Sequence, residues 1–233
     1  MTSENGDLKQ VEYGNGATVN YTYDDYGNIS AISQDGNTNF KWQYDSTGTM
    51  YAHDDLVNNQ RFIYTYDSTG RLVRQQVLDG SKKNIYSSQY GYDLNNNVSR
   101  FISSAGGVSV TENFEYGKDN LASKYTYPSG KTATYTYDGI LRRNNTVINT
   151  TTPIEQTYKY MASARGGNAQ TAKVEEEILG GNSYKYTYDA NGITSVLLKK
   201  STETAYTKQQ QFAYDELNQL IRADDLAKNR TEV

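Results

Sequence analysis

The sequence contains no cysteine among its 233 residues, which excludes disulfide bonds and thiolate metal sites. It has 2 prolines, 1 histidine and 1 tryptophan, and a single histidine disfavours a metal site or a catalytic triad. No apolar run approaches the roughly 20 residues that a membrane-spanning helix needs. The 23 basic and 27 acidic residues are mixed along the chain without a basic stripe, so nucleic acid is not expected as a partner.

The start of the sequence also lacks a secretory signal. Met1 is followed by Thr-Ser-Glu-Asn-Gly, which is neither basic nor apolar. If the natural protein is secreted, we therefore expect this chain to be an excised segment of it.

Tyrosine is what the sequence has in abundance, with 23 copies. The hydrophobic content of 36% is low for a globular protein, but a tyrosine ring supplies apolar area behind a polar tip. We therefore expect a folded chain whose core is rich in tyrosine.

The tyrosines recur in a motif, Tyr-x-Tyr-Asp-x-x-Gly/Asn, along almost the entire chain. Two degenerate copies, at Tyr116 and Tyr160, bring the array to about nine units of roughly 24 residues. The motif residues are Tyr21, Tyr23, Asp24, Gly27, Tyr44, Asp45, Gly48, Tyr64, Tyr66, Asp67, Gly70, Tyr90, Tyr92, Asp93, Asn96, Tyr135, Tyr137, Asp138, Tyr186, Tyr188, Asp189, Gly192, Tyr214, Asp215 and Asn218.

The motif predicts a strand followed by a tight turn. Two tyrosines that are two residues apart lie on the same face of a strand. An aspartate can accept backbone N–H groups in an Asx-type turn, and glycine or asparagine tolerates the positive φ that ends such a turn. Each aspartate is therefore interpreted as a turn cap, and the alternative, catalysis by paired carboxylates, would require two carboxyls about 5 Å apart in distinct environments.

A second turn signal falls midway through most units. Examples are Asn15-Gly16, Gly106-Gly107 and Gly180-Gly181, and dipeptides of this kind are strong hairpin signals. Each unit is thus predicted to be two strands and two turns. Residues 172–179 alternate in polarity and are predicted to be a strand, and the glycine-rich residues 165–168 are predicted to be a turn.

Residues 1–223 are therefore predicted to form one array of hairpins, followed by a charged tail at residues 224–233 that frays or forms one helical turn. The fold class is all-β, a continuous antiparallel and curved sheet. About 18 strands at ~4.8 Å each give a strip of roughly 86 Å, which would close into a tube only about 27 Å across. We expect an open sheet whose end strands are available for self-association.

The tandem motif Tyr-x-Tyr-Asp-x-x-Gly-x-Leu/Ile resembles the YD-repeat family, also called Rhs repeats, and the segment FAYDELNQLIRADD at residues 212–225 is especially similar. The family includes bacterial Rhs toxins, shell-forming components of insecticidal toxin complexes and animal teneurins. The resemblance implies a coiling sheet that forms a hollow shell, which encloses a toxin or acts as an extracellular scaffold. The closing segment and self-cleaving aspartate of many Rhs proteins are not found in this sequence.

Three features are weighed as possible binding or catalytic sites. Residues 93–97 read Asp-Leu-Asn-Asn-Asn, like the start of a calcium loop, but the glycine and the final glutamate of that loop are missing, which leaves a weak surface ion site as the alternative. His53 follows Tyr51-Ala52 and precedes two aspartates, and it is interpreted as a solvent-facing strand residue rather than a base. Trp42, Tyr44 and Tyr51 lie in a segment similar to choline- and glucan-binding hairpins, so they are candidate ligand-binding residues.

The sequence thus favours a structural, non-catalytic shell or scaffold segment of a large secreted or cell-surface protein. No cofactor or metal is expected. The expected partner is the rest of the parent polypeptide, including a possible enclosed toxin domain. The alternative is a module that binds a cell-wall glycan or a protein through a tyrosine-lined face.

Overall fold

The computed structural model describes residues 2–4, 6–162 and 170–233. All regular secondary structure in these residues is β-strand, and no helix long and apolar enough to cross a membrane occurs among them. The predicted all-β class is confirmed. The predicted turn at residues 165–168 lies outside the described residues.

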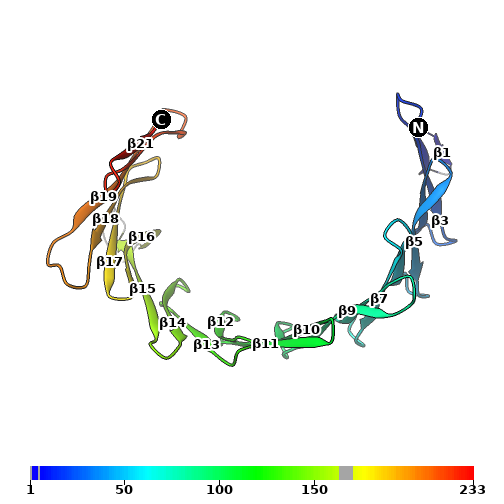
Figure 1. Cartoon of the computed structure of the whole chain (residues 1–233), viewed down its shortest axis with the longest axis horizontal. Helices are drawn as coiled ribbons and strands as arrows, with labels where there is room; N and C mark the ends of the chain where they lie inside the picture. The colour runs from blue at the N-terminus through cyan, green and yellow to red at the C-terminus, as the bar shows by residue number, and fades with distance from the viewer. Residues whose placement is uncertain (1, 5, 163–169) are drawn as a thin grey trace. The chain divides into compact units, whose positions relative to one another are not determined.

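The chain divides into two compact units, Met1–Asn113 and Phe114–Val233, and strand β11 contains the boundary. Figure 1 shows the strands of each unit side by side in a single layer. The first unit contains β1 (Thr2–Glu4), β2 (Asp7–Glu12), β3 (Thr18–Tyr23), β4 (Ile29–Gln34), β5 (Asn37–Tyr44), β6 (Met50–Asp55), β7 (Gln60–Tyr66), β8 (Leu72–Leu78), β9 (Asn84–Tyr92), β10 (Val98–Ala105) and most of β11 (Val108–Tyr116). The second contains the end of β11, then β12 (Ala122–Thr126), β13 (Thr132–Tyr137), β14 (Arg143–Asn149), β15 (Ile154–Ala162), β16 (Gln170–Leu179), β17 (Asn182–Tyr188), β18 (Ile193–Lys199), β19 (Thr207–Tyr214), β20 (Leu220–Asp225) and β21 (Arg230–Glu232).

Within each unit the strands follow one another as an antiparallel meander. The described pairings join strands that are neighbours in sequence, such as β3 with β4 and β4 with β5. Strand β1 pairs with β2 and strand β21 pairs with β20, with no further pairing described for either end strand. The prediction of tandem hairpins in an open antiparallel sheet, not a closed barrel, is confirmed.

A β-bulge recurs at the motif, and the sequence pattern does not predict it. The register of the hairpin slips immediately before the second tyrosine, for example between Thr22 and Tyr23 and between Thr65 and Tyr66. A bulge increases local twist and re-aims the side chain beside it. The extra residue, Ser30 or Val73 in these two hairpins, lies on the strand that follows, and the second tyrosine pairs just beyond it, with Ile29 or Leu72.

The motif turns end in the left-handed backbone conformation that the sequence predicts. Gly70 has φ 83° and Asn96 has φ 68°. Gly192 differs, because it is not among the positive-φ residues and its strand begins one residue earlier than in the other repeats, at Ile193. A side chain on Gly192 would lie 3.1 Å from the Tyr214 hydroxyl, so glycine is required there for space rather than for φ.

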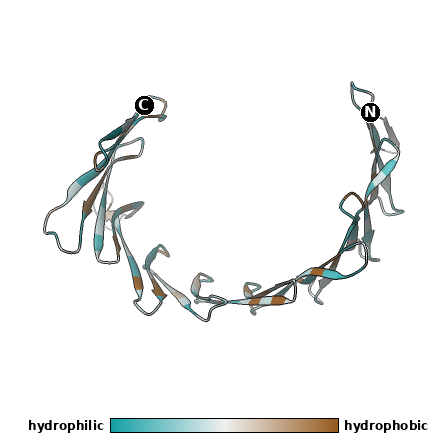
Figure 2. Ribbon diagram, viewed as in Figure 1, coloured by the Kyte–Doolittle hydropathy of each residue, from teal (hydrophilic) through white to brown (hydrophobic). Residues whose placement is uncertain are grey.

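Few apolar side chains are fully buried in this single layer. Among the described residues, Ala52, Val77 and Ala133 are the buried hydrophobic ones, and most motif tyrosines are half-buried. Figure 2 shows apolar and polar residues interspersed along the strands of each unit. Packing between neighbouring strands of the sheet, rather than a two-layer core, therefore supplies the apolar contacts.

The end of the chain differs from the expected frayed tail. Residues 224 and 225 complete β20, and β21 pairs with it from Ala223↔Glu232 to Asp225↔Arg230. The backbone N–H of Lys228 donates to Asp225, and Asn229 takes φ 52°, so this turn uses an aspartate cap and a left-handed asparagine. Strand β16 confirms the strand predicted at residues 172–179.

Candidate functional site: the inter-repeat tyrosine seam

The second tyrosine of each motif donates its hydroxyl to a backbone carbonyl of the preceding strand. These hydrogen bonds join Tyr23 to Leu8, Tyr44 to Ile29, Tyr66 to Met50, Tyr92 to Leu72, Tyr137 to Ala122, Tyr160 to Arg143, Tyr188 to Val174 and Tyr214 to Ile193, with O···O distances from 2.7 to 3.1 Å. We call this set the tyrosine seam. It links each motif hairpin to the strand before it.

The seam forms where the backbone ladder between repeats stops. The pairing of β4 with β5 ends at Ala31↔Lys41, so the carbonyl of Ile29 lies beyond the ladder. The Tyr44 hydroxyl reaches that carbonyl at 3.0 Å. A tyrosine side chain thus supplies the donor that a backbone N–H supplies elsewhere, and the half-buried carbonyl is satisfied.

The aspartate after the second tyrosine organises the turn. In the Asp67 turn, one carboxylate oxygen accepts the backbone N–H of Thr69 at 2.9 Å and of Arg71 at 3.0 Å. Equivalent pairs of bonds are made by Asp24, Asp45, Asp93, Asp138 and Asp215. Asp189 differs, because it accepts from Asn191 and Gly192 in the shorter turn.

These hydrogen bonds favour the ionised carboxylate. The Thr69 hydroxyl donates to Asp67 at 2.7 Å and, with Arg71, holds the pKa of that carboxyl well below its ordinary value. The hydroxyl of Thr47 lowers the pKa of Asp45 in the same way. The carboxylates are therefore occupied as acceptors within their own turns, an arrangement that differs from the free, paired carboxyls of a glycosidase.

A basic side chain connects some turns to the tyrosine of the next repeat. The Arg71 guanidinium pairs with Asp67 at 2.7 Å and lies 4.6 Å from the centre of the Tyr92 ring. Arg142 repeats this arrangement, with Asp138 at 2.6 Å and the Tyr160 ring at 4.1 Å. Cation–π contacts of this kind add to the seam.

The first tyrosine of each motif lies on the same face as the second and contacts its cross-strand neighbours. The Tyr90 ring lies 5.1 Å from that of Phe101, and the Tyr186 hydroxyl donates to Glu177 at 2.8 Å. Burial, followed by this bond to Glu177, raises the pKa of Tyr186. Tyr21 and Tyr135 face Ile32 and Thr146 across their hairpins.

His53 lies on this tyrosine face and is half-buried, not solvent-facing as the sequence suggested. Its ring stacks on Phe62 with centroids 4.3 Å apart, and its Nδ1 lies 3.2 Å from the Tyr64 hydroxyl. Burial lowers the pKa of His53, while Asp54 and Asp55 act in the opposite direction. The neighbours of His53 are thus aromatic rings on the tyrosine face.

The three candidate ligand-binding residues lie in two different settings. Trp42 and Tyr44 share one face of β5, and Trp42 faces His53 across the hairpin. The Tyr44 hydroxyl is engaged in the seam. Tyr51 is the extra residue of a bulge and is 42% exposed.

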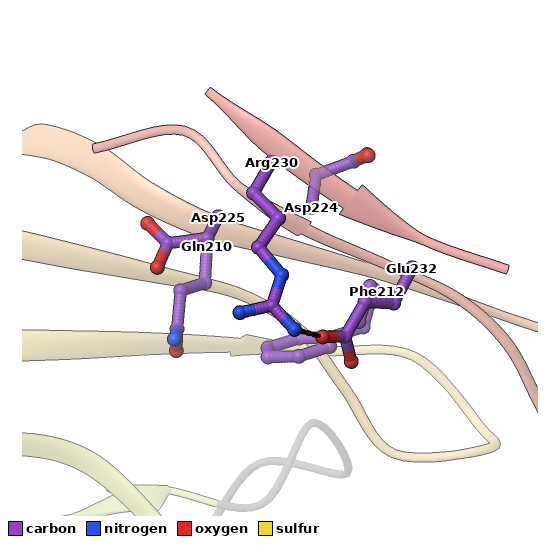
Figure 3. Close-up of a pocket in the computed structure, with 7 residues that line it drawn as sticks. Gln210, Phe212, Asp224, Asp225, Arg230 and Glu232 are labelled. Atoms are coloured by element: carbon purple, nitrogen blue, oxygen red, sulfur yellow. Dashed lines mark hydrogen bonds and ion pairs between the residues drawn. The ribbon is translucent and has the colours of Figure 1, made fainter. Parts of the chain in front are cut away.

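The hollow drawn in Figure 3 lies at the β19–β21 end of the second unit and has a volume of about 190 Å³. Figure 3 shows Arg230 paired with Glu232 beside the Phe212 ring. Asp224, on its edge, accepts hydrogen bonds from Arg222 and Thr231. The hollow is thus lined by charged groups that already have partners, and no cluster of three or more metal-ligating residues occurs among the described residues.

No family model and no curated protein matches this sequence. Solved structures do match. A chain of the Photorhabdus luminescens Tc holotoxin pore carrying a TccC3 mutation aligns with a TM-score of 0.56 and 16% identity over 94% of this chain. A complex of TcdB2, TccC3 and Cdc42 aligns with a TM-score of 0.51 and 13% identity over 90% of this chain, and TcdB2–TccC3 without its hypervariable C-terminal region aligns with 0.50 and 13% over 93%.

The chain spans only 13 to 14% of the length of these matched chains. At this identity the likeness is one of fold. The resemblance to YD-repeat shell proteins is confirmed at that level.

Proposed function

We propose that this chain is a non-catalytic wall segment of a larger YD-repeat protein and that it encloses or displays another part of that polypeptide. The observation that supports the proposal most strongly is the tyrosine seam. The hydroxyls of Tyr23, Tyr66 and Tyr188 and the carboxylates of the motif turns bond to backbone groups of the sheet itself. The repeated residues thus build the sheet.

The likeness to Tc toxin chains supports the same role. Those chains are about seven times longer than this one, as the 13 to 14% coverage implies. We therefore infer that the principal partner is the rest of the parent polypeptide, that the parent is secreted or carried on the cell surface, and that the enclosed part can be a toxin domain. The outer edges of β1 and β21, which have no further partner among the described residues, would join the neighbouring repeats of the parent, or another copy if those repeats are absent.

Limited proteolysis of the complete parent tests the enclosure proposal. The intact shell should protect a segment that becomes digestible after mild unfolding, while short flexible segments outside the shell are cut at once. A parent whose non-repeat part is digested at the same rate in the intact and unfolded states would contradict enclosure. Rapid digestion of this segment itself in the intact parent would contradict its role as a wall.

A glycan- or protein-binding module is the second candidate, and the stack of His53 on Phe62, with Trp42 opposite His53 in the β5–β6 hairpin, favours it. The rings of His53 and Phe62 are 4.3 Å apart, and Trp42 shares their half-buried face as the cross-strand partner of His53. Binding of this type should appear on a glycan array and be lost in Trp42→Ala, whereas Tyr13→Ala, which changes an exposed turn residue, should retain it. Absence of any signal for the unmodified chain on the glycan array would exclude glycan binding and favour the role as a wall segment.

A further inference from the structure

One turn of the second unit is longer than the others on its side of the sheet and folds back on the strands. Residues 200–206 connect β18 to β19, whereas Gly180 and Gly181 alone connect β16 to β17. Residues 200–205 are exposed, and Tyr206 is half-buried. We call residues 200–206 the strap.

Tyr206 fastens the strap to the face of the sheet opposite the tyrosine seam. Its hydroxyl lies 2.6 Å from Glu176 Oε1 and 2.6 Å from Ser183 Oγ. Ser183 also donates to Glu176, and Lys159 pairs with the other carboxylate oxygen at 2.6 Å. The Tyr206 hydroxyl therefore joins a hydrogen-bonded cluster that spans β15, β16 and β17.

Two further lysines surround the tyrosine ring. The Nζ atoms of Lys185 and Lys199 lie 4.9 Å and 5.1 Å from the ring centre. Cation–π attraction of this kind adds to the hydrogen bonds of the hydroxyl. The Tyr206 side chain therefore has hydrogen-bond partners for its hydroxyl and cationic partners for its ring.

The strap covers polar groups that are unusually buried for this molecule. Glu176 is 8% exposed and Ser183 is 4% exposed, although each belongs to a polar residue type in a single-layer sheet. If Tyr206 moved away from the sheet, Glu176 and Ser183 would each lose one hydrogen-bond partner. Water would then hydrogen-bond to the Glu176 carboxylate and the Ser183 hydroxyl. The free energy of opening the strap is therefore well below that of unfolding the strands.

The remaining attachments of the strap are few. The backbone N–H of Ser201 donates to Asn182 at 3.1 Å, and the N–H of Glu203 donates to the Lys200 carbonyl at 2.9 Å inside the strap itself. The first bond is exposed, and the second stays intact if the strap moves as a piece. Tyr206 is therefore the principal attachment between the strap and the sheet.

We propose that residues 200–206 are a strap that opens and closes over the polar face of β16–β18, with Tyr206 as its latch. In the open state the Glu176 carboxylate, the Ser183 hydroxyl and the lysines around them face solvent. The strands remain paired, because their ladder from Glu176↔Lys185 to Ser183↔Lys199 does not involve the strap. The strap is thus a local conformational device within the wall.

Hydrogen–deuterium exchange on the whole chain tests the latch. In the unmodified protein the amide of Ser201 should exchange through a local opening, faster than the amides of β17 and β18. Tyr206→Phe keeps the ring and removes the hydroxyl, so strap opening should increase about tenfold or more, the effect of losing a hydrogen bond to a charged group. The amides of β17 and β18 should keep their rates.

Tyr184→Phe is the matched control, because it removes a hydroxyl from the same strand as Ser183 on the opposite face. It should leave strap exchange unchanged. Trypsin cleavage after Lys200 should follow the same order, fast in Tyr206→Phe and slow in the control.

Two results would overturn the proposal. One is that strap and strand amides exchange at a common rate in the unmodified protein, so that the strap opens only when the strands unfold. The other is that Tyr206→Phe leaves strap exchange unchanged or accelerates strap and strands equally, which would make Tyr206 an ordinary part of the sheet. Glu176→Gln provides a second variant, and it should also speed opening of the strap alone.

Discussion

The second tyrosine of each motif joins two physical roles in one side chain. Its ring covers apolar area on one face of the sheet, and its hydroxyl reaches a carbonyl beyond the end of the backbone ladder, as Tyr44 does at Ile29. Phenylalanine could provide only the first role. The neighbouring aspartate caps the turn, and its carboxylate is kept ionised by the hydrogen bonds that it accepts.

The conformation of Leu141 yields a prediction about one turn. Leu141 stands where other motifs have glycine or asparagine, and it takes φ 67°. A left-handed conformation costs a non-glycine residue roughly 1–2 kcal/mol, and asparagine tolerates it better. Leu141→Asn should therefore raise the free energy of unfolding of the second unit by about 0.5–1 kcal/mol in a denaturant titration.

Ile140→Asn is the control for this prediction. Ile140 is also exposed in the same turn, but it is not among the residues with positive φ. It should leave stability nearly unchanged. Equal effects of the two variants would show that loss of an exposed apolar side chain, rather than backbone strain, is responsible.

The motif carboxylates predict how stability depends on pH. The pKa values of Asp24, Asp45, Asp67 and Asp93 are lowered in the folded chain, so the folded state holds these protons less tightly than the unfolded state. Their stabilisation is complete above the ordinary pKa of an aspartate and is lost as the pH falls through the folded values. The free energy of unfolding should therefore decline below about pH 4.

Asp67→Asn tests the origin of that decline. The variant should be less stable than the unmodified chain at neutral pH, and the difference should shrink as the pH falls toward 2, because the carboxyl of the unfolded chain is then protonated and must lose that proton on folding. A difference that is constant from pH 7 to 2 would contradict a role for the ionised form.

At the scale of elements, the sequence predicts the hairpins well because the signal for each one is local. Alternating tyrosines mark one face of a strand, and Asp-x-x-Gly marks its turn, as at Asp67 and Gly70. The bulge before the second tyrosine has no such signal, because it depends on how the neighbouring strand is paired. For the same reason the sequence shows that Tyr44 is repeated but not that its hydroxyl reaches Ile29.

The turn at Gly192 has no room for a larger side chain. A side chain there would approach the Tyr214 hydroxyl to 3.1 Å, and the backbone carbonyl of Ile193 accepts that hydroxyl at 3.1 Å. Gly192→Ala should therefore destabilise the second unit by about 1–3 kcal/mol, the usual cost of overpacking. Gly139→Ala, at a glycine with nothing within 4 Å of the added methyl group, should be tolerated.

Thermal unfolding of the two variants measures this difference. A lower melting temperature for Gly192→Ala alone supports a requirement for space beside the seam. A Gly139→Ala variant that is destabilised as much would attribute the effect to the loss of glycine flexibility in either turn.

For the whole molecule, the described pairings connect only strands that are neighbours in sequence. Stability in such a chain is approximately a sum over repeats and their nearest-neighbour contacts, so one region can unfold without the rest. The composition could not show this, because a low hydrophobic content is equally consistent with a small two-layer core. The position of the aromatic stack at His53 could not be predicted either, because the facing residue Phe62 lies on another strand.

Ala133→Leu tests this local character. Ala133 is 1% exposed in the second unit, so the larger side chain should destabilise that unit. Hydrogen–deuterium exchange should show faster exchange in β12–β15 and unchanged rates in β3–β8. Faster exchange throughout the chain would show that the sheet unfolds as one cooperative body.

The motif tyrosines hold neighbouring repeats together, and the variant Tyr66→Phe tests this role. This variant keeps the ring and removes the hydroxyl that donates to the Met50 carbonyl at 2.8 Å. We expect a loss of about 1 kcal/mol in the free energy of unfolding of the first unit, with faster amide exchange in β6 and β7. Tyr13→Phe, at an exposed turn, should cause no loss. A Tyr66→Phe variant as stable as this control would contradict the seam.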